Sequence, residues 1–458
     1  PAKLPPDAAA NWRRLEAIDA PRRTHAASDE ALARGEDLDD ASVAVDALFG
    51  TGLAREITGG HARLIENLGA ARRRGLRVLS VDIPSGIAAD TGAVLGVAVE
   101  ADATVTISLP KLGLALEPGR THAGEVIVAR IGIADPEPDR SAGAALWSAA
   151  AAASFFPERR RAGHKGSFGH VLVVAGSAGK TGAAALTSRA AIRTGAGLVT
   201  LAHPSGLEAE LAALPVEVMS APVAATEHGG FARAGEKAID ELVAARDVVA
   251  LGPGIGTDPE TVALVRRIVA TIERPLVVDA DGLNALQGQL STLHERNIPA
   301  VLTPHPGEAA RLLESDAAAQ NADRVGAARA LARASHSVVT LKGAATVVAD
   351  PDGRALVVPT GGPVLASGGT GDVLTGVVAG LLAAGLPPFE AAGLASWWHG
   401  AAADRVAQAR VGFGLLASEL ADGLPVTAEA IATAAGATRD GNGKGGSHGV
   451  LALRFPNA

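Results

Sequence analysis

The sequence predicts an α/β protein of two domains, each built on a largely parallel sheet, and three observations support this fold class. The chain has 458 residues, which is too long for one typical core. Short runs rich in Val, Ile and Leu alternate with helical segments and end at Gly, Pro or Asp. This alternation is typical of a parallel sheet covered by helices on both faces. A proline-rich break at residues 135–139 divides the chain in two.

The first block begins its α/β alternation after about forty polar, alanine-rich residues. A strand is predicted over 42–49, where it meets the turn Gly50-Thr51-Gly52. A helix is predicted over 61–74, because Leu64, Ile65 and Leu68 recur at helical spacing. Further strands are predicted at 77–83, 104–108 and 125–131. We assign residues 1–134 to this first domain.

The second block is longer and repeats the same alternation. Residues 135–154 are predicted to be a linker with a connecting helix at 143–154, residues 155–438 a doubly wound domain, and residues 439–458 a loose glycine-rich tail. Its strands are predicted at 170–175, 198–202, 248–251, 275–279, 300–303, 337–341 and 345–350. One helix is predicted from about residue 371, and another carries Trp397, Trp398 and His399.

Composition excludes several classes of protein. With no cysteine, the chain has no disulfide, thiolate metal site or catalytic thiol. Its net charge of −8 argues against a nucleic-acid-binding surface, and we interpret the run Arg159-Arg160-Arg161 as a solvated linker. No secretory signal opens the chain, and the most apolar stretch, 373–386, is too short and too glycine-interrupted to span a bilayer. We therefore expect a cytoplasmic protein with no membrane partner.

The strongest chemical motif is the segment 366–372, Ala-Ser-Gly-Gly-Thr-Gly-Asp, which runs directly into an apolar helix. Glycines let a backbone approach a ligand closely, and the free N–H groups of a first helical turn attract a phosphoryl group. Asp372, placed there, could take a proton from a hydroxyl that attacks a phosphate. The alternative is that Asp372 only caps the helix.

Other loops follow predicted strands, where ligands bind in open α/β sheets. The segment 342–346 is suited to phosphate or ribose contact, and 303–308 holds His305 between two prolines. A histidine such as His305 is, taken alone, more often structural. The loops 252–256 and 279–281 are weaker signals of the same kind.

Together these motifs, with His164-Lys165-Gly166 and Thr181-Gly182-Ala183, resemble the ADP- or ATP-dependent NAD(P)H-hydrate dehydratases, a ribokinase-like family. The resemblance implies dehydration of (6S)-NAD(P)H hydrate (NADHX or NADPHX) by phosphorylation of its C6 hydroxyl. It implies that Asp372 is catalytic and that Ala183, Gly254, His305 and Asp372 contact the hydrate. It further implies that ADP or ATP, with Mg²⁺, is bound by Lys342, Gly343, Ala344, Ala345, Thr346 and Gly371.

The first block resembles the Rossmann-like NAD(P)H-hydrate epimerase that is fused to the dehydratase in bifunctional repair enzymes. The residues that carry this resemblance are 46–53 with Arg55, 81–86 with Asp90 and Gly92, and 101–106 with Lys111 and Gly113. The resemblance implies that Asp46 and Ser85 ligate K⁺. It also implies contacts to the hydrate from Gly50, Thr51, Gly52, Leu53, Ala54, Arg55, Glu56 and Asp82. The alternative is that loop N–H groups merely satisfy these carboxylates.

The first block also departs from the epimerase pattern. The family's upstream helix, strand and Asn-Asn-Gly-Gly-Asp loop have no counterpart before Asp46, and the chain starts at Pro1 without methionine. We therefore expect a truncated or processed start, an incomplete first domain with an uncovered sheet edge, and inefficient epimerase activity.

Two rival functions remain open from the sequence. A ribokinase-like kinase of vitamin precursors would share the Gly-Thr-Gly-Asp helix start but not the fused first block. A non-catalytic binding protein would not need an intact Asp372 turn. The choice between ADP and ATP also stays open, with ADP slightly favoured, and we expect a homo-oligomer.

Overall fold

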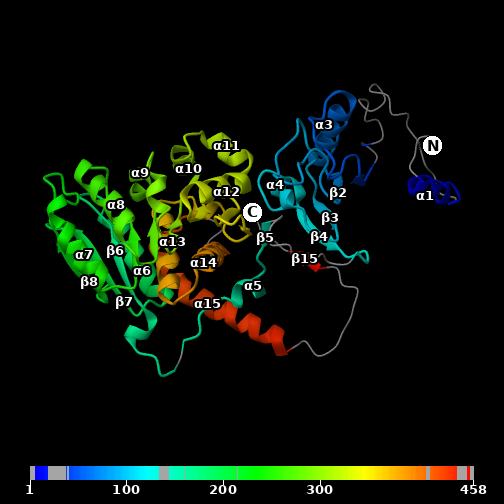
Figure 1. Cartoon of the computed structure of the whole chain (residues 1–458). Coiled ribbons are helices and arrows are strands. Elements are labelled where there is room, and N and C mark those ends of the chain that lie inside the picture. The colour runs from blue at the N-terminus through cyan, green and yellow to red at the C-terminus, as the bar shows by residue number, and fades with distance from the viewer. Residues whose placement is uncertain are drawn as a thin grey trace.

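The computed structural model describes residues 6–18, 38, 41–133, 144–159, 161–213, 215–408, 413–440 and 451–453. They form two sheets in two blocks, with helix α1 (Pro6–Glu16) lying apart from both (Figure 1). Arg160, residues 135–143 of the predicted linker and most of the predicted tail lie outside the described residues. No helix among the described residues is long and apolar enough to cross a membrane.

The first sheet has the strand order β1-β2-β3-β4-β15. Its first four strands are parallel: β1 (Val43–Asp46), β2 (Arg77–Val81), β3 (Ala103–Ile107) and β4 (Glu125–Ala129). Strand β15 (Leu451–Leu453) pairs antiparallel with β4. The four parallel strands were predicted, whereas β15 falls in the segment predicted as a loose tail.

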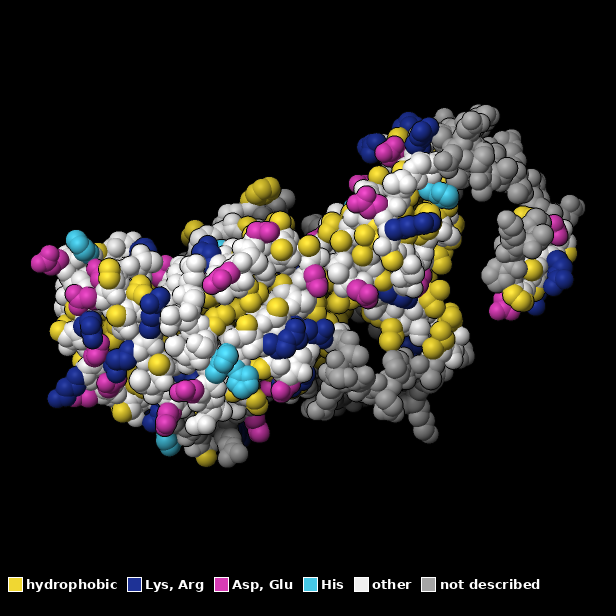
Figure 2. Space-filling view, turned by 45° about the horizontal axis from the view of Figure 1, so that its top comes forward, with side chains coloured by type: hydrophobic (Ala, Val, Ile, Leu, Met, Phe, Trp, Pro, Cys, Tyr) yellow, Lys and Arg dark blue, Asp and Glu magenta, His cyan; other side chains and the backbone are white. Residues whose placement is uncertain are grey.

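Only one face of this sheet is fully buried among the described residues. Helix α3 (Gly59–Arg73) packs Ile65 and Leu68 against Val78. On the other face Val43 and Val45 are 59% and 62% exposed, and Figure 2 shows hydrophobic side chains gathered on the surface of this block. The prediction of two covered faces is therefore wrong for the described part of this sheet, whereas β1 lies at the sheet's edge as predicted.

The second sheet has ten strands in the order β5-β14-β13-β12-β11-β10-β9-β6-β7-β8. All neighbours are parallel except β12 with β13 and β13 with β14. The strands are β5 (Ala144–Leu146), β6 (His170–Val174), β7 (Leu198–Pro204), β8 (Val218–Val223), β9 (Val248–Leu251), β10 (Leu276–Val278), β11 (Val301–Leu302), β12 (Val338–Leu341), β13 (Thr346–Ala349) and β14 (Ala355–Val358). Strands β5, β8 and β14 were not predicted from the sequence.

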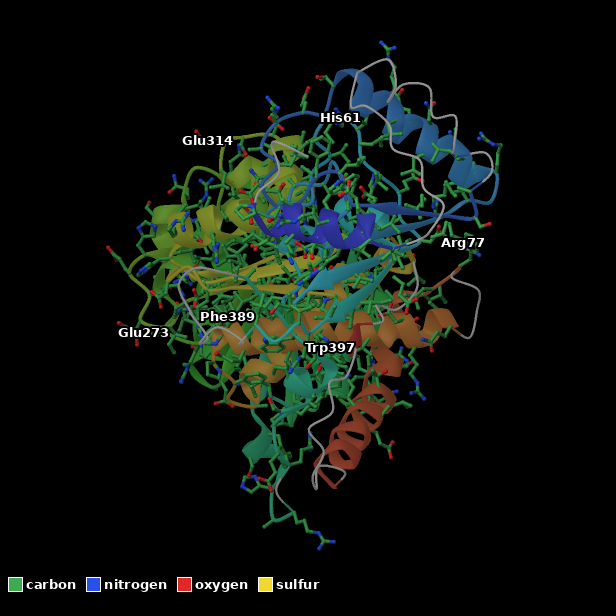
Figure 3. The ribbon with its side chains drawn as sticks, turned by 90° about the vertical axis from the view of Figure 1, so that its right-hand side faces the viewer. His61, Arg77, Glu273, Glu314, Phe389 and Trp397 are labelled. Carbon is green, nitrogen blue, oxygen red and sulfur yellow. The ribbon has the colours of Figure 1, made fainter. Side chains whose placement is uncertain are left out.

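Helices cover both faces of this second sheet (Figure 1). One face packs against α6 (Thr181–Thr194), α13 (Thr370–Ala383), α14 (Pro388–Gln408) and α15 (Ala417–Asp440). The other face packs against α7 (Glu236–Ala244), α8 (Pro259–Thr271), α9 (Asp281–Ala285), α10 (Pro306–Leu312) and α12 (Arg324–Ser335), with α11 (Ala317–Ala322) beside them. The apolar stretch at 373–386 is a buried helix, as predicted, and Phe389 and Trp397 on α14 are buried too (Figure 3).

The two blocks touch each other through the end of the first one. Ala115 and Leu116, which precede α4 (Gly119–Ala123), pack into the core of the second block. The Arg120 guanidinium donates to the carbonyl oxygen of Pro359 at 3.4 Å. Within the linker, β5 joins the second sheet and α5 (Ala149–Ala153) follows it, so the second block's structure begins before residue 155.

The close approach of α6 and α13 predicts a stability effect. A Cβ on Gly376 of α13 would lie 2.2 Å from the carbonyl oxygen of Thr187 on α6. Gly376→Ala should therefore force the helices apart and lower the free energy of unfolding by about 2–3 kcal/mol. Gly182→Ala, on α6 where a Cβ meets nothing within 4 Å, should be neutral or slightly stabilising. Urea unfolding measures both, and equal stabilities of the two variants would contradict the prediction.

Candidate active site

The glycine-rich turn positions the start of α13 at the carboxyl edge of the second sheet. Gly369 precedes the helix with φ +89°, and a Cβ there would lie 2.5 Å from Leu186 Cδ1, so glycine is required. The Thr370 hydroxyl donates to the carbonyl oxygens of Leu365 and Ser367 at 2.9 and 3.0 Å. No side chain caps the helix at Gly369. The first-turn N–H groups are thus available to an anion.

Asp372 is the third residue of α13 and is half-buried beside this turn. The pKa of Asp372 is raised to about 7, first by burial and then by the Asp279 and Asp281 carboxylates, against the opposing charge of Lys342. A carboxylate with a pKa near neutrality is suited to accept a proton from a substrate. The helix-cap alternative does not account for this placement, because Asp372 lies inside the first turn rather than at its cap.

Lys342, at the end of β12, forms an ion pair beside Asp372. Its Nζ lies 2.8 Å from Asp279 Oδ1 and 3.9 Å from Glu308 Oε2. Burial disfavours the charge, but the Asp279 and Glu308 carboxylates outweigh burial and hold the pKa of Lys342 above its usual value. A Cβ on Gly371 would lie 3.4 Å from this Nζ. The structure therefore brings Lys342, Gly371 and Asp372 together.

His305 has a structural role in the loop that precedes α10. Its Nδ1 accepts from the N–H groups of Gly307 and Glu308 at 3.0 and 3.3 Å, and Glu308 Oε2 accepts from the His305 N–H at 2.8 Å. This capping box fixes the helix start. The imidazole is still 51% exposed, so its outer face remains open to a ligand. Both interpretations of His305 are therefore compatible with the structure.

The other predicted dehydratase residues lie in the first turn of α6, in the loop after β9, and between β12 and the start of β13. A Cβ on Gly254, which has φ +61°, would lie 3.0 Å from Ala183 Cβ, so these two residues are in close contact. Gly343 and Ala344 are exposed, whereas Ala345 is buried at φ +55° and the Thr346 hydroxyl donates to the Gly343 carbonyl oxygen at 3.3 Å.

Three side chains that were not predicted as site residues support this part of the site. Arg324 is buried and donates to the carbonyl oxygens of Leu341 and Lys342 at 3.0 and 3.1 Å, and burial lowers its pKa to about 10. Thr375 donates to Asp279 Oδ2 at 2.7 Å. His399 on α14 donates from Nε2 to the Thr370 carbonyl oxygen at 2.9 Å, and burial lowers its pKa to about 4. Thr375 and His399 are polar residues inside apolar helices, and this pattern could have indicated their roles from the sequence.

In the first block, the predicted metal ligands Asp46 and Ser85 are adjacent. Asp46 is buried, and its carboxylate accepts from the Ser85 hydroxyl at 2.6 Å, the Ser85 N–H at 2.8 Å and the Ser80 hydroxyl at 2.8 Å. The Ser85 hydroxyl also lies 3.2 Å from the Phe49 carbonyl oxygen. Hydrogen-bond donors therefore satisfy the Asp46 carboxylate, in line with the alternative interpretation. Asp46 Oδ1, Ser85 Oγ and the Phe49 carbonyl oxygen also lie close to one another.

The predicted hydrate-binding residues of the first block surround this point. Gly50, Thr51, Gly52, Ala54, Arg55 and Glu56 are exposed, and Leu53 is half-buried. Asp82 has φ +71°, and its Oδ1 accepts from Lys111 Nζ and from the Ile107 N–H at 2.9 Å. Asp46 and Asp82 thus lie at or just beyond the carboxyl ends of β1 and β2.

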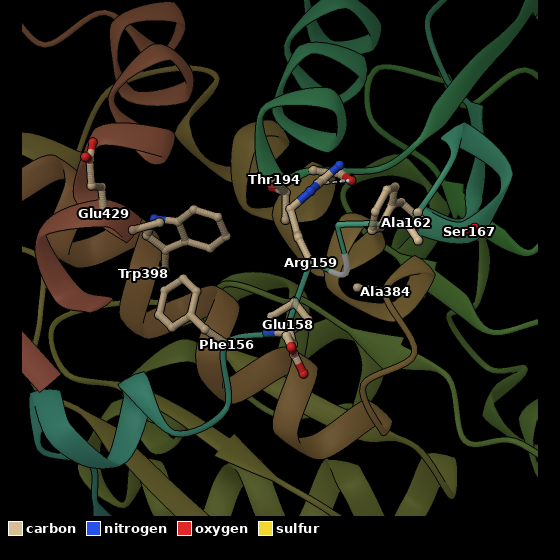
Figure 4. A pocket seen from close by; sticks show the side chains of 14 residues that line it. Phe156, Glu158, Arg159, Ala162, Ser167, Thr194, Ala384, Trp398 and Glu429 are labelled. Atoms are coloured by element: carbon tan, nitrogen blue, oxygen red, sulfur yellow. Dashed lines mark hydrogen bonds between the residues drawn. The ribbon is translucent and has the colours of Figure 1, made fainter. Parts of the chain in front are cut away.

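A cavity of about 830 Å³ lies elsewhere in the second block (Figure 4). It is lined by Phe156, Arg159, Thr194 and Trp398, and by Ala384, just past the end of α13. Since α13 rises 1.5 Å per residue, this cavity is roughly 18 Å along the helix from Asp372. Arg159 is exposed, and its guanidinium donates to the Gly195 carbonyl oxygen at 2.8 Å and lies 4.0 Å over the Phe168 ring.

Comparison with known proteins identifies the family. A model described as NAD(P)H-hydrate dehydratase matches residues 171–426, and one described as YjeF-related protein N-terminus matches residues 1–113. The bifunctional NAD(P)H-hydrate repair enzyme of Moorella thermoacetica is 44% identical over 84% of this chain and 72% of its own length. The chain belongs to this bifunctional repair-enzyme family. The family member from Thermofilum pendens is 40% identical, over 88% of this chain and 76% of that protein.

Solved structures match the second block of this repair-enzyme family member. The ADP/ATP-dependent NAD(P)H-hydrate dehydratase of Bacillus subtilis, co-crystallised with ATP and Mg²⁺, is 30% identical with a TM-score of 0.54. It aligns over 63% of this chain and 99% of its own. A ribokinase-like superfamily protein of Enterococcus faecalis, 24% identical, aligns over 65% of this chain and 99% of its own with a TM-score of 0.56. The predicted ribokinase-like fold is confirmed.

Proposed function

We propose that the second block converts (6S)-NAD(P)H hydrate to NAD(P)H at the expense of ADP or ATP. The observation that carries this proposal is the half-buried Asp372 carboxylate at the open N-terminus of α13, with the Lys342 ammonium beside it. Both lie at the carboxyl edge of a ribokinase-like sheet, where ligands of open α/β folds bind. Membership of the repair-enzyme family points to the same substrate.

The proposed reaction makes a poor leaving group into a good one. Asp372 accepts the proton of the C6 hydroxyl as its oxygen attacks the terminal phosphoryl group of the nucleotide. The N–H groups of the turn at Gly369 to Gly371 stabilise the charge that develops on that group. The ring nitrogen lone pair then expels the C6-bound phosphate, and loss of the C5 proton from the resulting iminium ion restores the C5–C6 double bond. The products are NAD(P)H, inorganic phosphate and a nucleotide shortened by one phosphoryl group.

The proposed substrate sites follow the loops around this turn. ADP or ATP would lie against Lys342, Gly343, Ala344, Ala345, Thr346 and Gly371. The hydrate would contact Ala183, Gly254, His305 and Asp372. Mg²⁺ is proposed to be held by nucleotide phosphates and water, because the described residues contain no group of three acidic or histidine side chains able to hold a metal ion.

In the first block we propose a K⁺ site and a hydrate epimerase site. Asp46 Oδ1, Ser85 Oγ and the Phe49 carbonyl oxygen supply hard oxygen donors of the kind that K⁺ prefers. The exposed loop from Gly50 to Glu56 and Asp82 would contact the hydrate. The test of this site supplies the R hydrate and follows its loss beyond the rate of spontaneous epimerisation. Fast consumption of the R hydrate would contradict the expectation of inefficient epimerase activity.

The decisive test of the dehydratase proposal incubates the purified chain with the S hydrate, Mg²⁺ and either ADP or ATP. We expect the absorbance of reduced nicotinamide to appear only with nucleotide and substrate together, and the better nucleotide to show the higher kcat/KM. Absence of nucleotide-dependent turnover with both would overturn the proposal. Phosphorylation of a vitamin precursor without hydrate turnover would favour the kinase alternative. Light scattering on the same sample tests the proposed homo-oligomer.

A further inference from the structure

The Asp279 carboxylate links three elements beneath the proposed catalytic turn. Asp279 follows β10 and is 1% exposed. Its Oδ1 receives Lys342 Nζ from the end of β12 at 2.8 Å, and its Oδ2 receives the Thr375 hydroxyl from α13 at 2.7 Å. Its backbone N–H donates to the Leu251 carbonyl oxygen at 3.1 Å. Both carboxylate oxygens are therefore fixed by hydrogen bonds.

A gain in folding stability is a weak explanation for the buried ion pair between Asp279 and Lys342. Two buried charges lose hydration, and apolar residues of similar volume often stabilise a fold as well or better. The Asp279–Lys342 pair touches the proposed site on two sides. Thr375 lies three residues after Asp372 on α13, and the Lys342 ammonium lies beside Gly371. The pair is thus placed to act on Asp372.

Asp279 and Asp372 compete for the same ammonium. Lysine has three donors and no fixed direction, and Lys342 interacts electrostatically with Asp279, Glu308 and Asp372. Asp279 holds it at hydrogen-bond distance, and the structure shows no hydrogen bond from Lys342 to Asp372 among the described contacts. If Asp279 were neutral, the ammonium would turn to Asp372 and occupy the carboxylate that must accept a proton.

We propose that Asp279 is a positioning residue that keeps Lys342 from pairing directly with Asp372 and aims its ammonium at the transferred phosphoryl group. This inference rests on the proposed dehydratase function. The charged and titratable groups that face this point from the surrounding elements are Asp279, Asp281, Lys342, Glu308 and His399, with Lys180 paired to Asp281. Of the carboxylates other than Asp372, Asp279 lies closest to the ammonium.

The test compares kcat and KM of the full chain across pH for Asp279→Asn. We expect kcat to fall about 10- to 100-fold with little change in KM for the hydrate. The acid limb of the pH profile should move to lower pH, because Asp372 loses a neighbouring negative charge and gains an ammonium partner. Thr375→Val removes one hydrogen bond to Asp279, so it should change kcat and the position of the acid limb in the same direction but by less. Thr375→Ser keeps the hydroxyl and should show wild-type values of both.

The matched control is Asp350→Asn, which breaks another ion pair with a buried carboxylate in the same sheet. Asp350 is 3% exposed and pairs with Arg354 at the far end of β13. It should lower stability without moving the pH profile. An active wild type with an unchanged profile in Asp279→Asn would overturn the positioning role and leave the dehydratase function standing. If Asp279→Asn does not fold, an unchanged pH profile in Thr375→Val overturns the positioning role of Asp279. An inactive wild type overturns the proposed dehydratase function itself.

Discussion

Asp372→Asn will lower kcat for nucleotide-dependent hydrate dehydration by roughly a thousandfold, the middle of the range for loss of a general base. Asparagine keeps the size of the side chain but cannot accept the hydroxyl proton. The helix start should survive, because Gly369 and Thr370 set the turn without help from the Asp372 side chain. Initial rates with saturating hydrate and nucleotide measure the effect.

The fall in rate should not come from lost binding. Nucleotide affinity, measured by calorimetry, should not fall and should rise by less than about threefold, since the neutral side chain removes a negative charge near the phosphates. Asp240→Asn, which alters an exposed carboxylate paired with Arg267 on the opposite face, is the control and should keep wild-type kcat. Wild-type turnover in Asp372→Asn would refute the proton-acceptor assignment.

Local patterns were sufficient to predict the position of the catalytic turn. Glycines at 368, 369 and 371, followed by an apolar run, predict a helix start whose free N–H groups face outwards, and α13 begins at Thr370. The strand-end loops were predictable for the same reason. The apolar runs end at Gly, Pro or Asp, and parallel strands present those ends at one edge.

Contacts between distant residues were not predictable in this way. Asp279 and Lys342 are 63 residues apart, and nothing in their own neighbourhoods shows that they pair. Strand β15 lies at the far end of the chain from its partner β4. Strand β8 was missed because its residues alternate irregularly between buried and exposed positions. Strand β14 follows residues 350–353, whose composition is typical of a turn, but no second strand was predicted after that turn.

The same Asp372→Asn substitution should also stabilise the second block, by an amount that grows as the pH rises from about 4 to about 7. Burial raises the pKa of Asp372 from 3.8 to about 7, so the folded state binds this proton more tightly than the unfolded state. Wild-type stability from this group is therefore fully present below about pH 4 and is lost as the pH rises through 7. Asparagine carries no charge to desolvate. The variant should gain roughly 2–4 kcal/mol over wild type at pH 8, less than the full shift implies because the carboxylate is partly open to solvent.

Urea unfolding at pH 5 and pH 8 separates this effect from a general change in packing. Fluorescence of the buried Trp397 and Trp398 reports on the second block. The gain at pH 5 should be clearly smaller than the gain at pH 8, whereas Glu273→Gln, an exposed change at the periphery (Figure 3), should show no such difference. Equal gains at both pH values would mean that the proton-binding equilibrium of Asp372 does not contribute. A proton acceptor that costs stability where it is ionised is the expected consequence of holding a carboxylate in a site built to bind phosphate.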